Sequence, residues 1–149
     1  MVRKAVVTGI GIVSSLGDNA KEVLTSLKEC KSGISYSEEY AEKGFRSHVY
    51  GMPKIDLNDA LDRKNKRFMG DGAAYNYLSM EEAIADSGLS EEQVSHERTG
   101  LIMGSGGPST RNLIQAADTA RERGPKKVGP FMVPRTMSST NSATLATPF

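Results

Sequence analysis

The sequence is poor in residues that hold small proteins together through covalent or metal bonds. It has no tryptophan, one cysteine (Cys30) and two histidines (His48 and His96) in 149 residues. A single cysteine excludes an internal disulfide framework and fits a reducing compartment. The histidines stand alone, without the spacing of a metal site, so we interpret both as solvated surface residues.

Long apolar runs and an excess of charge are also missing. Apolar residues make up 38% of the chain, charged residues 25%, and the formal net charge is +1. No stretch is long enough to span a membrane. The near-neutral charge disfavours a general nucleic-acid or membrane-binding surface. Because Thr8, Gly9 and Gly11 interrupt the first apolar run, it is not typical of a signal peptide, and we expect a soluble, cytoplasmic, single-domain protein.

Hydrophobic patterning predicts an α/β fold with a mostly parallel sheet, because short strands alternate with helices. Buried strands are expected at residues 5–8 and 101–103, and a further short strand at 47–50. The predicted helices cover residues 19–30, 68–87, 109–123 and 137–146, with a short one starting at Ser90.

Particular residues set the expected ends and faces of these helices. Asn19 with Glu22, and Ser90 with Gln93, have capping-box spacing, and Gly88 is a typical helix stop. In the helix from Ser109, the side chains of Leu113, Ile114 and Ala117 are expected to face inward.

Two glycine-containing turns are candidate binding sites. Gly9 and Gly11 fit part of a dinucleotide fingerprint, but Ser14 occupies the third glycine position, and we favour a tight turn. The run Gly104–Gly107 lacks the Lys-Ser/Thr ending of a phosphate-binding loop. Ser105 is not expected to be a nucleophile, because Met103 stands where the nucleophile elbow needs glycine. We interpret this loop as the wall of a ligand pocket.

Cys30 and the basic clusters are the remaining candidates. Cys30 follows a predicted helix, whose C-terminal dipole disfavours a thiolate, so we interpret it as incidental. Residues 63–67 hold four basic side chains, and a second basic group is formed by Arg121, Arg123, Lys126 and Lys127. These basic residues form either a solvated face or a binding site for an anionic partner. The binding site is favoured if the two groups meet in space. Nucleic acid is disfavoured because no aromatic residues interleave with them.

Several segments together resemble the β-ketoacyl-acyl-carrier-protein synthases. They are VVTGIGIVSSLG at residues 6–17, Ser32-Gly33-Ile34, DRKNKRFMGD at 62–71, SMEEAIADSGLS at 79–90, LIMGSGGPS at 101–109 and LATPF at the end. The match is collinear over the whole chain, and LIMGSGG and LATPF resemble the type I enzymes more than the type II ones.

The resemblance implies a thiolase-like fold of stacked α-β-α-β-α layers, of which residues 1–149 would be the incomplete N-terminal part. It implies a homodimeric acyltransferase of fatty acid biosynthesis. The reaction would be decarboxylative Claisen condensation between a cysteine-bound acyl chain and malonyl-acyl-carrier protein. No cofactor is implied. The family's catalytic cysteine, histidines and lysine have no counterpart in these residues, so no catalytic residue is assigned, and Cys30 is not the nucleophile.

The resemblance does imply binding roles for particular residues of this chain. Gly107, Pro108, Leu113, Val133 and Met137 match positions at the acyl pocket and dimer interface, although Pro108 replaces the usual small residue. A docking surface for the acidic acyl carrier protein is implied at Arg63, Lys64, Arg67, Arg123, Lys126 and Lys127. The alternatives are a type II synthase, a non-catalytic homologue that binds carrier protein, and, outside the family, a nucleotide-binding α/β domain.

Overall fold

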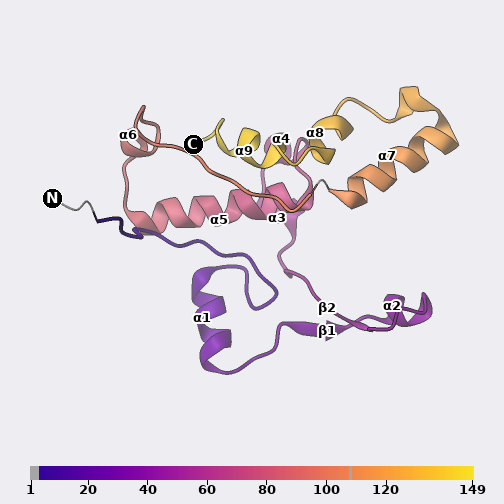
Figure 1. Cartoon of the computed structure of the whole chain (residues 1–149), viewed down its shortest axis with the longest axis horizontal. Helices are drawn as coiled ribbons and strands as arrows, with labels where there is room; N and C mark the ends of the chain where they lie inside the picture. Colours follow the sequence, from indigo (N-terminus) through magenta and orange to yellow (C-terminus); the bar gives the residue numbers. More distant parts are fainter. Residues whose placement is uncertain (1–3, 108) are drawn as a thin grey trace.

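The long helix α5 (Asp71–Ser87) lies at the centre of the molecule, with other segments on both sides of it (Figure 1). The computed structural model describes residues 4–107 and 109–149. α5 begins at Asp71 rather than at Phe68. It ends as predicted, because Gly88 adopts a left-handed φ of 66°, which glycine tolerates without steric cost.

The other helices, in chain order, are α1 (Ala20–Lys28), α2 (Glu38–Glu42), α3 (Leu57–Ala60), α4 (Arg63–Lys66), α6 (Glu91–Val94), α7 (Thr110–Arg123), the 3-10 turn η1 (Pro125–Lys127), α8 (Met132–Thr136) and α9 (Thr140–Leu145). Four of them, α1, α6, α7 and α9, lie where helices are predicted, whereas α2, α3, α4, α8 and η1 were not predicted. The side chain of Asn19 accepts a hydrogen bond from the Glu22 N–H at 2.9 Å, which caps α1 as expected. Ser90 and Gln93 form the predicted capping box of α6.

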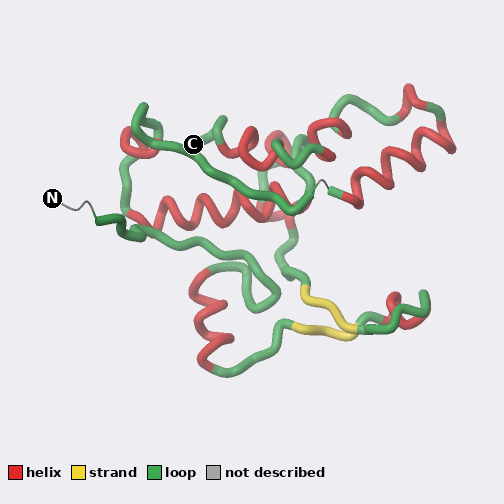
Figure 2. The backbone as a smooth tube through the Cα atoms, viewed as in Figure 1, coloured by secondary structure: helices red, strands yellow, loops and turns green. Residues whose placement is uncertain are grey.

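The predicted mostly parallel sheet is wrong for the described residues. The strands there are β1 (Ile34–Tyr36) and β2 (Val49–Gly51), which pair antiparallel with Ser35 opposite Tyr50 (Figure 2). β2 lies close to the strand predicted at 47–50. Residues 5–8 and 101–103 are extended but belong to no strand pair. A strand needs a neighbour to accept and donate its backbone hydrogen bonds, and no described segment lies beside either run in that way.

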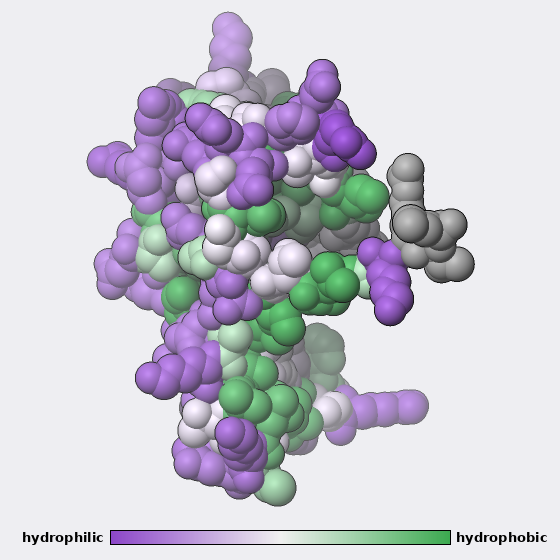
Figure 3. All heavy atoms as spheres, turned by 90° about the vertical axis from the view of Figure 1, so that its left-hand side faces the viewer, coloured by the Kyte–Doolittle hydropathy of each residue, from purple (hydrophilic) through white to green (hydrophobic). Residues whose placement is uncertain are grey.

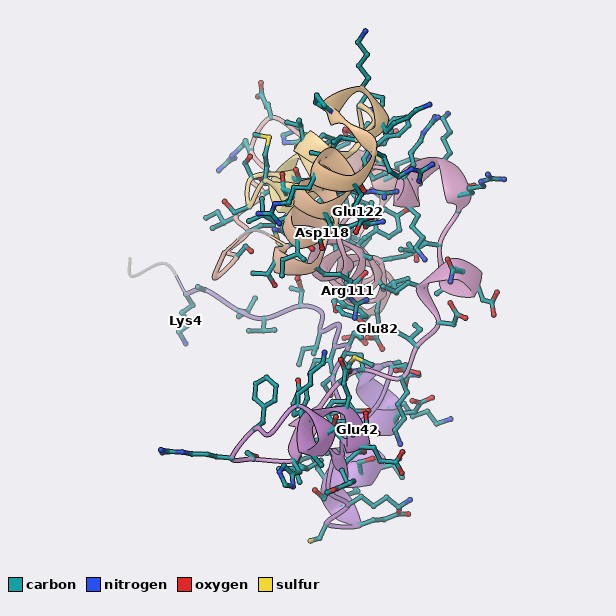
Figure 4. All side chains as sticks on the ribbon, turned by 90° about the vertical axis from the view of Figure 1, so that its right-hand side faces the viewer. Lys4, Glu42, Glu82, Arg111, Asp118 and Glu122 are labelled. Carbon is teal, nitrogen blue, oxygen red and sulfur yellow. The ribbon has the colours of Figure 1, made fainter. Side chains whose placement is uncertain are left out.

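The N-terminal segment instead runs along α5 and is held by acidic side chains of that helix. The carboxylate of Glu82 accepts hydrogen bonds from the backbone N–H groups of Ile12 and Ala20, both at 2.8 Å. Asp86 accepts one from the Ile10 N–H at 2.9 Å. Figure 4 shows Glu82 where α5 faces the N-terminal part of the chain. These contacts satisfy backbone donors that a sheet would otherwise satisfy.

Gly9 and Gly11 make this close approach possible. A Cβ atom at Gly11 would lie 1.8 Å from the Ser79 carbonyl oxygen, and one at Gly9 would lie 2.2 Å from that of Ala83. Both distances are far below van der Waals contact. The two glycines therefore pack the segment against α5. The tight turn predicted there is wrong in position, because the chain turns between Ser14 and Gly17 instead.

The hydrophobic core lies on the side of α5 that faces α3 and α9. Leu57, Leu61, Met69, Ala73 and Ala74 form its buried cluster. α9 packs along α5 and contributes Leu145, whose side chain is fully buried. The predicted helix of small residues is confirmed in α9, although it spans only Thr140–Leu145.

Much apolar surface remains uncovered in the described residues. Val6, Val7 and Ile102, predicted in buried strands, are strongly exposed. Leu113 and Ile114 of α7, predicted to face inward, are also exposed, because no described segment covers that face of the helix. Figure 3 shows hydrophobic side chains at the surface over the middle and lower parts of one face. Within the described ranges, no helix is both long enough and apolar enough to cross a membrane.

Candidate functional site

A cavity of about 280 Å³ lies where the glycine loop 104–107 faces the beginnings of α5 and α7. Its walls include Ser105 and Gly107 of the loop, the first turns of both helices, and Met137 after α8. Gly107 and Met137 are both among the predicted acyl-pocket residues. The structure therefore brings two residues together that are thirty positions apart in the sequence.

The other predicted pocket residues do not line this cavity. Leu113 on α7 is 51% exposed and Val133 on α8 is 65% exposed. α7 and α8 pack against one another, but neither of these two side chains is among the residues that line the cavity. Pro108 lies outside the described residues.

Arg111 and Asp71 form an ion pair at the edge of the cavity. The Arg111 Nη1 atom lies 2.9 Å from Asp71 Oδ2, which joins the first turn of α7 to the first turn of α5. Burial raises the pKa of Tyr75, and the nearby Asp71 carboxylate raises it further. Sequence reasoning missed this pair, because residues forty positions apart show no local pattern.

Asn141, a buried residue of α9, lines the cavity and is hydrogen-bonded to Asn76 of α5. Asn76 Nδ2 on α5 donates a hydrogen bond to Asn141 Oδ1 on α9 at 2.8 Å. Asn141 Nδ2 donates to the Ser138 carbonyl oxygen at 2.8 Å. Asn141 is buried, and both polar atoms of its side chain are hydrogen-bonded. It therefore holds α9 against α5 in one register. Asn141 was not singled out from the sequence.

The residues dismissed as nucleophiles or ligands occupy ordinary surroundings. The Ser105 hydroxyl donates to the Gly107 carbonyl oxygen at 2.8 Å, within its own turn. Cys30 is exposed after the end of α1. His48 packs edge-on against Tyr36, and His96 Nδ1 accepts the Arg98 N–H. Over residues 4–107 and 109–149, no cluster of metal-ligating side chains is present.

The predicted carrier-protein residues lie in two groups on the surface. Arg63 and Lys64 belong to α4, and Arg67 follows it, so they share one short stretch. Arg123 ends α7, and Lys126 and Lys127 lie in η1. The two groups do not meet, because α4 lies beside α9 and α8 whereas η1 lies at the far end of α7 (Figure 1). A partner that touches both must be broad enough to extend past α8.

The path of the backbone identifies the fold. The structure described as the ishigamide ketosynthase/chain length factor aligns with a TM-score of 0.80 at 20% identity, over 95% of this chain and 36% of that one. The fold is therefore that of a ketosynthase segment.

The sequence then defines the family. Residues 3–149 match the family described as Beta-ketoacyl synthase, N-terminal domain, and the chain belongs to it. The 3-oxoacyl-[acyl-carrier-protein] synthase 1 of Haemophilus influenzae is 53% identical over 149 residues. The protein of the same name from Escherichia coli strain K12 is 53% identical over 150 residues. Each match covers 99% of this chain and 37% of the relative, and the predicted type I resemblance is confirmed.

Proposed function

We propose that this chain forms the acyl-pocket wall and part of the carrier-protein docking surface of a type I β-ketoacyl-acyl-carrier-protein synthase. The observation that carries the proposal is the 53% identity over 99% of the chain to synthases of that name. The enzyme would act as a homodimer in fatty acid biosynthesis. Its substrates would be an acyl thioester and malonyl-acyl-carrier protein.

The reaction would join an enzyme-bound acyl group to the carbanion that malonyl-carrier protein forms when it loses CO₂. The new carbon–carbon bond releases the enzyme thiol and leaves a β-ketoacyl-carrier protein. We assign this chain the binding part of that task, because none of its residues matches a catalytic group of the family. Gly107 and Met137 would border the acyl chain, and the cavity they share supports this assignment.

The docking surface would attract the acidic carrier protein through opposite charge. Arg63, Lys64 and Arg67 are exposed on one stretch, as docking requires. Exposed charges of this kind mainly raise the rate of encounter and make binding sensitive to salt. Arg123, Lys126 and Lys127 would form a second, separate contact at the end of α7, open only to a partner broad enough to extend past α8.

The test is a charge reversal in a chimeric synthase, in which residues 1–149 replace the matching segment of the Escherichia coli relative. Arg63→Glu, Lys64→Glu and Arg67→Glu together should weaken carrier-protein binding about tenfold or more at low salt. The matched control reverses Lys21, Lys28 and Lys31 on and after α1, which changes the net charge by the same amount. Unchanged affinity in the first variant, or an equal loss in the control, contradicts the docking assignment.

A further inference from the structure

Arg67 is held in place by contacts that its basic neighbours do not have. Its guanidinium carbon lies 5.2 Å from the centroid of the Phe68 ring and 5.6 Å from that of Phe131. Both distances are within the range of cation–π attraction. Its Nε atom donates a hydrogen bond to the Lys64 carbonyl oxygen at 3.2 Å.

The two aromatic rings form a fixed support beneath this side chain. They meet edge to face, with centroids 5.1 Å apart and an interplanar angle of 84°. Phe68 is 39% exposed and Phe131 37% exposed, so each ring is anchored on one side and open on the other. Arg135 Nε on α8 donates to the Arg67 carbonyl oxygen at 2.9 Å, which also ties the backbone of residue 67 to α8.

Arg63 and Lys64 are less constrained. Within the described residues, the side chains of these two exposed cations make no hydrogen bond, ion pair or aromatic contact. The terminal nitrogens of Arg67 donate no hydrogen bond within the same residues, although its Nε does. Arg67 is thus oriented while its two terminal nitrogens stay available, which is the arrangement that suits a bidentate contact with a carboxylate.

We propose that Phe131 is a positioning residue that, with Phe68, orients the Arg67 guanidinium for bidentate contact with a carboxylate on the carrier protein. This inference rests on the docking role proposed above. An oriented side chain loses less rotamer freedom when it binds, so the aromatic support raises affinity without touching the partner. The start of α8, where Phe131 is the N-cap residue, therefore belongs to the docking surface.

The experiment is a double-mutant cycle in the chimeric synthase, with carrier-protein affinity measured at low salt. Phe131→Leu keeps apolar bulk but removes the ring, and should weaken binding about two- to fivefold, the size expected for an exposed cation–π contact. In the Arg67→Ala background the same change should have no further effect. Phe131→Tyr should retain wild-type affinity. The matched control is Phe45→Leu, an exposed aromatic residue whose ring packs against that of Tyr40, and this change should leave carrier-protein affinity unaltered.

Three readouts separate positioning from a general structural role. Phe131→Leu should raise KM for the carrier-bound substrate and leave kcat unchanged. The NMR resonance of the Arg67 Nε–H group should lose its aromatic ring-current shift. The Arg67 side chain should become more mobile. Arg67→Lys, which leaves both rings in place and needs no refolding of α8, should lose about as much affinity as Phe131→Leu, because lysine has no planar fork.

The outcomes distinguish this inference from the docking proposal. If Arg67→Ala leaves carrier-protein affinity unchanged, Arg67 does not dock the partner and both statements about it fall. If Arg67→Ala weakens binding while Phe131→Leu or Arg67→Lys binds like the wild type, docking stands and positioning is overturned. An equal effect of Phe131→Leu with and without Arg67 also overturns it.

Discussion

Two regions of the molecule are stabilised in different ways. The core region (residues 55–107 and 109–149) surrounds the apolar cluster of α3 and α5 and the fully buried Leu145. In the N-terminal region (residues 4–54), Val23 is the one buried residue, although all of these positions are described. That region is attached to α5 mainly by backbone hydrogen bonds to Glu82 and Asp86 and by the close approach of Gly9 and Gly11.

The difference predicts separate responses to perturbation. Apolar burial is nondirectional and sums over many contacts, so damage to the core region affects the whole cooperative unit. The hydrogen bonds to the carboxylates of Glu82 and Asp86, by contrast, depend on the correct placement of a few atoms. Their loss should free the N-terminal region locally while the core region stays folded.

The largest expected effect is that of Leu145→Ala in the core region. Removing a fully buried leucine side chain costs about 2–5 kcal/mol, because transfer free energy is lost and a cavity remains. The free energy of unfolding is measured by urea denaturation followed by circular dichroism. Leu27→Ala in α1 is the matched control, since Leu27 is largely exposed and should change stability by no more than about 0.5 kcal/mol. Equal losses in the two variants would erase the contrast between the regions.

Gly11→Ala should act next most strongly, and on the N-terminal region. The new Cβ atom would lie 1.8 Å from the Ser79 carbonyl oxygen, so the segment must move off α5. We expect a cost of about 3 kcal/mol, at the upper end of overpacking. Hydrogen exchange should accelerate over residues 10–28 only. Gly72→Ala inside α5 is the control, because its Cβ meets nothing within 4 Å and alanine favours a helix.

Three helix ends, the starts of α1 and α6 and the end of α5, were predictable from sequence because they depend on neighbours within four residues. Asn19 accepts the Glu22 N–H, Ser90 pairs with Gln93, and Gly88 closes α5, each as its local pattern indicates. The ladder partners of residues 5–8 and 101–103 depend on distant segments instead. Their apolar composition predicts burial, yet burial is realised only when another segment covers them, so the sheet prediction failed.

The candidate site shows the same division between local and distant information. The glycine loop and the basic residues 63–67 were found because they are contiguous in sequence. Met137 was placed at the pocket by family resemblance alone. Asp71, Arg111 and Asn141 were missed, because their partners lie about 40 or 65 positions away. No periodicity or motif encodes such pairs.

Glu82→Gln tests the polar attachment of the N-terminal region more gently. The amide keeps one accepting oxygen, so one of the two N–H groups, of Ile12 or Ala20, loses its partner. We expect local opening to become easier by about 1–2 kcal/mol, since a hydrogen bond to a charged group is lost. Amide exchange at residues 10–28 should rise while α9 is unaffected. The neighbouring Glu81→Gln, which removes the same charge from α5, should leave those amides unchanged; an equal response would mean that charge alone matters.

The smallest expected effect concerns the pKa values of two acidic side chains, one from each region. The Asn58 backbone N–H, 2.7 Å from Asp56 Oδ1, lowers the pKa of that carboxyl at the start of α3. In the N-terminal region, the hydrogen bond and charge of Lys43 lower the pKa of Glu39. Because both pKa values are lowered on folding, each carboxylate stabilises its helix above its ordinary pKa, and the contribution disappears as the pH falls through the lowered value.

Salt should separate these two causes. At about 1 M salt the charge of Lys43 is screened, so the pKa of exposed Glu39 should return towards its ordinary value. The pKa of Asp56 should stay low, since a backbone N–H at short range is not screened by ions. Carbon-13 titration of both carboxyl groups at low and high salt measures this directly, and Lys43→Gln should reproduce the effect of salt on Glu39 alone. If salt raised both pKa values equally, Asp56 would be held by the charge of Lys66 rather than by the N–H group at the start of α3.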